Sequence, residues 1–118
     1  MKQIMVVDDD RDILALVDLI LKGSDVKTII SDQPSQVIDD VRNNQPDTLL
    51  MDISMPPYDG RDICKSLKAI YKDDLFIILF SANKITSTSL RDSEADGFLQ
   101  KPFDIEDLLK AVLVKVDK

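Results

Sequence analysis

Short, unbroken runs rich in Val, Ile and Leu recur along the chain, and their length limits the folds that it can adopt. The runs are Ile4 to Val7, Val26 to Ile30, Thr48 to Met51, Leu75 to Phe80 and Phe98 to Leu99. Such runs lack the apolar–polar alternation of a half-exposed strand, and they are typical of strands that are covered on both faces. They predict a parallel sheet with helices packed on both sides.

Segments with helical spacing lie between these runs. Their apolar stripes are Ile13, Leu14, Val17, Ile20 and Leu21; Val37, Ile38 and Val41; Ile63, Leu67 and Ile70; and Ile105, Leu108, Leu109, Val112 and Val116. Asp10 is expected to cap the first helix and Gly23 to end it, and the second stripe ends before Asn43, Asn44 and Pro46. The Ser- and Thr-rich segment 83–94 predicts a fourth helix that is short or mobile. Strand and helix therefore alternate, which predicts a doubly wound α/β fold.

The chain's length and charge limit its organisation and its partners. Its 118 residues suit one domain, and the sequence contains no repeat, linker or low-complexity tract, so we assign 1–118 to a single domain. A net charge of -7 disfavours direct binding to nucleic acid or to an anionic membrane. No apolar stretch is long enough for a membrane span, and the N-terminal segment has no signal-peptide pattern. We therefore expect a cytoplasmic protein.

Cys64 is the single cysteine, and the chain has no histidine. One cysteine cannot form an intramolecular disulfide, and its small side chain fits a core position better than a reactive-thiol site. The lack of histidine removes the usual catalytic triads, most zinc sites and a role as a phosphohistidine carrier. Any site must be built from other side chains.

Polar residues follow the predicted strands at the points where open α/β sheets bind their ligands. These residues are Asp8, Asp9, Asp10, Asp52, Ser81 and Lys101. Carboxylates gathered at one edge repel one another and require a cation, and Mg²⁺ fits best where every ligand is an oxygen. A nearby ammonium can balance this charge at rest or hold a phosphoryl oxygen. The set suits phosphoryl transfer to a carboxylate, with an aspartyl phosphate as the product.

Each of these residues also has a plainer interpretation. Adjacent acids such as Asp8 and Asp9 often form a solvated turn and a helix cap. Ser81 can simply end a strand, and Lys101 can belong to a turn. Asp52 is the strongest single candidate, because a carboxylate at the end of a buried strand is costly without a partner. The functional interpretation rests on all of them falling at successive strand ends.

Four segments resemble the receiver domains of two-component response regulators. They are IMVVDD at 4–9, PDTLLMDISMPPYDG at 46–60, LFSA at 79–82 and FLQKPF at 98–103. Each is weak alone, but the four in this order and spacing are specific, and they span the chain. The resemblance implies a flavodoxin-like fold with five helices and a five-stranded parallel sheet in the order 2-1-3-4-5.

The resemblance also implies a role for each acid of the site. Asp52 would accept the phosphoryl group and, with Asp8, Asp9 and the backbone carbonyl of Ser54, would hold Mg²⁺. Lys101 would contact the phosphoryl group, and its bond to the following proline is usually cis in the family.

Further residues would form a switch and set the lifetime of the phosphate. Ser81 would hydrogen-bond a phosphoryl oxygen and make room for the ring of Phe98, which stands where the family more often has tyrosine. The plainer interpretation of Phe98 is a core residue. The side chains of Ser54 and Asn83 would influence phosphate lifetime. The output surface would comprise the fourth helix, the fifth strand and the fifth helix.

The leading hypothesis is a signalling switch that is phosphorylated by a sensor histidine kinase or a histidine phosphotransfer protein. It would catalyse only its own phosphorylation and dephosphorylation, and it would dimerise or act through a fused output domain or a separate target. A phosphatase of the haloacid dehalogenase type would carry a second aspartate where this chain has Ser54. A flavodoxin-like mononucleotide binder would need a Ser/Thr/Gly phosphate loop in place of DDDRD. A degenerate receiver that binds partners without phosphorylation would not need a full set of site residues.

Overall fold

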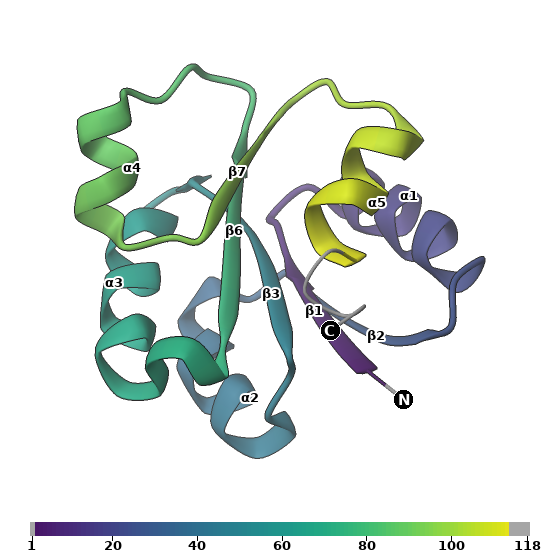
Figure 1. Ribbon diagram of the computed structural model, residues 1–118, viewed down its shortest axis with the longest axis horizontal. Helices are drawn as coiled ribbons and strands as arrows, with labels where there is room; N and C mark the ends of the chain where they lie inside the picture. Colours follow the sequence, from purple (N-terminus) through teal and green to yellow (C-terminus); the bar gives the residue numbers. More distant parts are fainter. Residues whose placement is uncertain (1, 114–118) are drawn as a thin grey trace.

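A five-stranded parallel sheet forms the centre of the fold, with helices on both of its faces (Figure 1). The computed structural model describes residues 2–113. The strands of the sheet are β1 (Lys2–Val7), β2 (Val26–Ser31), β3 (Thr48–Asp52), β6 (Phe76–Ser81) and β7 (Gly97–Gln100). They lie in the order β2-β1-β3-β6-β7. This is the predicted order 2-1-3-4-5 once two short strands outside the sheet are left out of the count.

The sheet separates two apolar cores, and helices cover one core on each face (Figure 1). One face is covered by α1 (Arg11–Lys22) and α5 (Ile105–Leu113), and the other by α2 (Val37–Asn44), α3 (Gly60–Tyr71) and α4 (Ser87–Ser93). Two 3-10 turns occur at Pro34–Gln36 and Lys72–Asp74. Because strand residues alternate between faces, Ile4 and Val6 join the first core, whereas Met5 and Val7 join the second. Every residue of β3 is buried, which explains its continuous apolar sequence.

Cys64 belongs to the core beneath α2 and α3, as predicted. Its side chain is fully buried, and this burial raises the pKa of the thiol to about 12. A thiol with so high a pKa stays protonated at neutral pH and is a poor nucleophile. Cys64 therefore acts as a small apolar residue of the core.

The ends of α1 agree with the prediction, and α2 extends past the end of its apolar stripe. Asp10 caps α1 with its side chain, and Gly23 follows the last residue of the helix. The apolar stripe of α2 ends before Asn43, and the helix itself continues to Asn44. Gln45 then adopts the left-handed conformation, and its N–H donates to the carbonyl oxygen of Val41 at 2.8 Å. A backbone hydrogen bond of this kind ends a helix without a glycine.

Three residues that were expected on the core faces of helices are exposed. The exposed fractions are 42% for Ile38, 61% for Ile70 and 58% for Ile105. Helical spacing identifies a broad stripe, but only the middle of that stripe reaches the sheet. In α3 the buried residues are Gly60, Cys64, Leu67 and Lys68. Val116, which completes the last predicted stripe, lies outside the described residues.

The fourth helix is short, as predicted. α4 has seven residues, and the side chain of Thr86 accepts a hydrogen bond from the N–H of Ser89 at its first turn.

Within residues 2–113, no helix has both the length and the apolar character that a membrane span requires.

A small hairpin that the sequence did not predict follows β3. Its strands are β4 (Ser54–Met55) and β5 (Tyr58–Asp59), which pair antiparallel. Pro56 and Pro57 connect them through a cis peptide bond. Met55 is fully buried in the core beneath α2 and α3. The hairpin therefore holds the loop after Asp52 against the body of the protein.

Lys68 ties α3 to the ends where β6 and β7 begin. Its Nζ donates to the carbonyl oxygens of Lys72 and Leu75, at 2.7 and 2.9 Å, and to Oδ2 of Asp96 at 2.9 Å. The same carboxylate oxygen accepts the N–H of Ile77 at 2.8 Å. All three donors of the ammonium are therefore satisfied, although the Lys68 side chain is buried.

Replacement of Lys68 by methionine should destabilise the protein. Lys68→Met keeps most of the apolar volume but removes the ammonium that donates to the Asp96 carboxylate and to two carbonyl groups, which should lower the free energy of unfolding by about 2–4 kcal/mol. Urea unfolding followed by circular dichroism measures this difference.

Lys110→Met is the matched control. Lys110 pairs with Glu106 at 3.1 Å on an exposed surface, so its loss should cost no more than about 0.5 kcal/mol. Equal effects of the two substitutions would contradict the structural role of Lys68.

Candidate functional site

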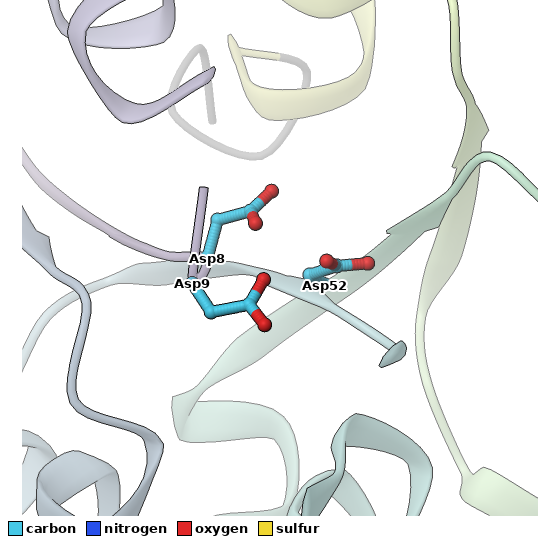
Figure 2. A group of neighbouring side chains, drawn as sticks. All are labelled: Asp8, Asp9 and Asp52. Carbon is cyan, nitrogen blue, oxygen red and sulfur yellow. The ribbon is translucent and has the colours of Figure 1, made fainter. Parts of the chain in front are cut away.

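Three carboxylates meet at the edge of the sheet where β1 and β3 end (Figure 2). Asp8 and Asp9 follow β1 directly, and Asp52 is the last residue of β3. One carboxylate oxygen of each lies within 4.8 Å of the other two. Asp8 and Asp52 are buried, whereas Asp9 is exposed. The structure thus brings together the acids that the strand ends predicted. Asp10 instead caps α1, where its Oδ1 accepts the N–H of Asp12 at 2.9 Å.

Lys101 reaches this cluster from the far end of the sequence. Its Nζ lies 2.8 Å from Oδ2 of Asp8 and 3.5 Å from Oδ2 of Asp52. The ammonium also lies 4.4 Å from the centre of the Phe80 ring, a distance at which cation–π attraction operates. Phe80 was not predicted as part of the site, because its place in an apolar strand gave no signal beyond core packing. The Lys101–Pro102 bond is cis, as the resemblance implied.

The hydroxyl and the aromatic ring of the expected switch lie on neighbouring strands. Ser81 ends β6 and is buried, and its Oγ accepts the N–H of Asn83 at 3.0 Å. Phe98 pairs with Leu79 across β6 and β7, and its half-buried ring packs against the core beneath α2 and α3. This packing is compatible with the core interpretation of Phe98 as well as with the switch. A pocket of about 250 Å³ lies beside Ser81, and its lining includes Ser54, Asn83 and Arg61.

The comparison with known families decides what kind of domain this is. Residues 4–113 match the family model described as the response regulator receiver domain. The chain belongs to this family. It is a receiver domain of the kind found in two-component systems.

Individual relatives and solved structures agree with this family. Response regulator MprA of Mycobacterium sp. (strain KMS) is 33% identical over 109 residues, which cover 91% of this chain and 47% of that protein. The chain thus spans about half the length of the curated relatives that it matches. The N-terminal signal receiver domain of a two-component response regulator from Bacteroides fragilis has a TM-score of 0.85 at 27% identity, and the match covers 100% of this chain and 98% of that one. A two-component response regulator from Clostridium difficile has the same fold, with a TM-score of 0.90 at 18% identity over 100% and 98% of the two chains.

The electrostatics of the receiver domain favour a cation at the cluster. Burial, followed by the charge of Asp8, raises the pKa of Asp52 to about 6, while Lys101 opposes this rise. Burial and the neighbouring Asp8 also raise the pKa of Asp9. One ammonium does not balance three carboxylates, and every ligand atom that the cluster offers is an oxygen. This donor set fits a hard divalent cation such as Mg²⁺.

Gly60 lets the start of α3 contact the backbone of the Asp52 strand end. Its N–H donates to the carbonyl oxygen of Ile53 at 2.8 Å. A β-carbon on Gly60 would overlap the carbonyl oxygen of Asp52, and it would lie 3.0 Å from the carbonyl carbon of Asp52 and 3.1 Å from the α-carbon of Ile53. The glycine of the Asp-Gly pair is thus required by this close backbone approach.

Arg61 connects this region to α4 and was not singled out from the sequence. Its Nε donates to Oδ1 of Asp59 at 3.0 Å, and its Nη1 donates to Oγ of Ser89 at 3.0 Å. The hydrogen bonds from Arg61 hold the pKa of Asp59 below its usual value. Asp59 also caps α3, so the same carboxylate anchors both the helix and the arginine. No local motif marks this arginine, because Ser89, its partner on α4, is 28 residues away.

Gly60→Ala should destabilise the receiver domain by about 2–4 kcal/mol, because the added methyl group overlaps backbone atoms that cannot rotate away. Gly23→Ala is the control, since its β-carbon would lie 3.4 Å from the nearest carbonyl oxygen, which leaves room for it. Thermal and urea unfolding of both variants measure the difference. A Gly60→Ala protein as stable as Gly23→Ala would contradict the close approach.

Asp52→Asn should stabilise the metal-free protein at neutral pH. The folded protein raises the pKa of Asp52 from 3.8 to about 6, so it binds a proton more tightly than the unfolded chain does. The stability from this proton is complete below the lower value and is lost as the pH rises through the higher one. At about pH 7.5 the variant should exceed the wild type by about 1–3 kcal/mol, and at about pH 4 most of this difference should vanish.

Urea unfolding in EDTA at the two pH values measures this difference. Asp25→Asn changes an exposed carboxylate between α1 and β2, and it should shift stability by no more than about 0.5 kcal/mol at either pH. An Asp52→Asn protein that is less stable than the wild type at neutral pH would contradict the raised pKa.

Proposed function

We propose that this receiver domain is a phosphorylation-dependent signalling switch in which Asp52 accepts a phosphoryl group. The observation that carries the proposal is the cluster of Asp8, Asp9 and Asp52 with Lys101 at one sheet edge. With a pKa near 6, Asp52 is mostly a carboxylate at neutral pH and can act as a nucleophile. In the transfer, an Asp52 oxygen bonds to phosphorus while the bond from phosphorus to the donor's leaving atom breaks.

The acidic cluster would also bind a metal ion. Asp8, Asp9, Asp52 and the backbone carbonyl of Ser54 would hold Mg²⁺, which neutralises charge on the phosphoryl group when it is bound. The N–H of Ser54 donates to Oδ1 of Asp52 at 3.3 Å and so helps to orient the acceptor. Lys101 would exchange its contact with Asp52 for a phosphoryl oxygen.

The hydroxyl and the ring on β6 and β7 would convey the change. Ser81 would donate its hydroxyl proton to a phosphoryl oxygen, and Phe98 would move toward the space that the hydroxyl leaves. The exposed surface of α4, β7 and α5 would serve as the output surface. Ser54 and Asn83 face the pocket beside Ser81, where they would control the access of water to the phosphoryl group.

The phosphodonor would be a phosphohistidine on a sensor histidine kinase or a histidine phosphotransfer protein. Its phosphorus–nitrogen bond would break as the bond to Asp52 forms, and the imidazole would leave. The domain would catalyse only its own phosphorylation and dephosphorylation, in the cytoplasm, and would dimerise or bind its target after phosphorylation.

Incubation with acetyl phosphate and Mg²⁺ tests the proposal, with intact-mass spectrometry as the readout. The wild type should gain the mass of one phosphoryl group, and neither Asp52→Asn nor a sample in EDTA should gain it. Asp10→Asn is the matched control: asparagine caps a helix as well as aspartate does, so this variant should be phosphorylated like the wild type. A folded wild type that gains no mass, or an adduct that persists in Asp52→Asn, would count against the proposal.

A further inference from the structure

Gln100 ends β7, next to Lys101, and its side-chain amide contacts three backbone carbonyl groups. Its Nε2 lies 3.1 Å from the oxygen of Ser81, 3.0 Å from that of Ala82 and 3.1 Å from that of Lys101. Carbonyl oxygens only accept hydrogen bonds, so the NH₂ group and not the oxygen of the amide must face them. Two N–H groups are shared among three acceptors, and both donors of the amide are therefore used.

These carbonyl groups belong to two separate segments at the sheet edge where Lys101 meets the acidic cluster. Ser81 and Ala82 lie at the end of β6, where the chain leaves the sheet toward α4, and Lys101 lies just beyond the end of β7. The backbone ladder joins the two segments once more, through the N–H of Lys101 and the carbonyl of Ser81 at 2.8 Å. Beyond that point, the Gln100 amide extends the connection to Ala82.

The strand itself does not require a glutamine at this position. The residue is exposed, and the pairing of β6 with β7 uses backbone groups. A residue chosen only for an exposed strand end would need no donor that reaches three carbonyl groups. The amide does, however, bridge the backbones of Ser81 and Lys101.

We propose that Gln100 is a positioning residue for phosphoryl transfer, which fixes the spacing between Ser81 and Lys101. The inference rests on the proposed function, in which both side chains contact the same phosphoryl group. A phosphoryl group in transfer is stabilised by donors that are already in place, so a looser connection between the two donors slows the reaction. Gln100 acts through the backbone and does not itself contact the phosphoryl group.

The test compares the rates at which acetyl phosphate phosphorylates the wild type, Gln100→Met and Gln100→Lys. Methionine has a similar length and no donor, so Gln100→Met should lower the rate at saturating acetyl phosphate by about 5-fold, as the loss of one or two hydrogen bonds predicts. Lysine can donate to the same carbonyl groups, so Gln100→Lys should restore the rate to within about 2-fold of the wild type.

Two further measurements separate positioning from a general loss of structure. The Mg²⁺ affinity should stay within about 2-fold in every variant, because the proposed metal ligands lie just after β1, at the end of β3 and on β4, and a positioning effect is confined to the two donors. Gln36→Met, which replaces an exposed glutamine with no side-chain cap hydrogen bond, should react like the wild type. Gln100→Ala gives a second variant without a donor if the methionine variant does not fold.

The outcomes distinguish this inference from the proposed function. If the wild type is phosphorylated and the donor-free variants react at the same rate, Gln100 has no positioning role and the proposed function stands. A rate loss that Gln100→Lys does not restore, or an equal loss of Mg²⁺ affinity, would likewise overturn the inference. If the folded wild type accepts no phosphoryl group, both fail.

Discussion

The contacts of Lys101 with Asp8 and Asp52 are the interaction on which the acidic edge depends. Asp8 and Asp52 are buried close together, and without a cation their repulsion would oppose folding. The ammonium comes from a residue 93 positions after Asp8, so only the completed sheet can supply it. The parallel topology makes this possible, because β1, β3, β6 and β7 all end at the same edge. The charge balance of the site therefore depends on the order of the strands.

The architecture could be predicted because a strand that is buried on both faces has a continuous apolar sequence. β3 is covered on both faces, and its apolar run predicted this without knowledge of its neighbours. Helix faces were harder to predict. The spacing that found α3 and α5 also included Ile70 and Ile105, which are exposed, because the limits of a packed stripe depend on how the helix lies on the sheet. The hairpin after Asp52 was missed because two-residue strands leave too little pattern.

Some residues of the site could likewise be predicted from the sequence, and others could not. Asp8, Asp9, Asp52, Ser81 and Lys101 could be predicted because each lies at or just after the end of a strand, and topology alone brings strand ends together. Their roles in phosphoryl transfer come from the resemblance and stay predictions. Arg61 and Gln100 could not be found in this way. Each acts through a side chain that reaches a partner on another element, and only three-dimensional geometry reveals such a partner.

The contact at Gly60 makes the surroundings of Asp52 mechanically unequal on its two sides. On the α3 side, the backbone of Asp52 touches the backbone of the helix with no side chain between them. On the α4 side, the connections are side-chain hydrogen bonds from Arg61 to Ser89 and from Gln100 to backbone carbonyl groups, which can be exchanged for others at small cost. The α3 side is therefore stiff and the α4 side compliant. If Asp52 accepts a phosphoryl group as proposed, a displacement that starts there should meet less resistance toward α4 and β7 than toward α3.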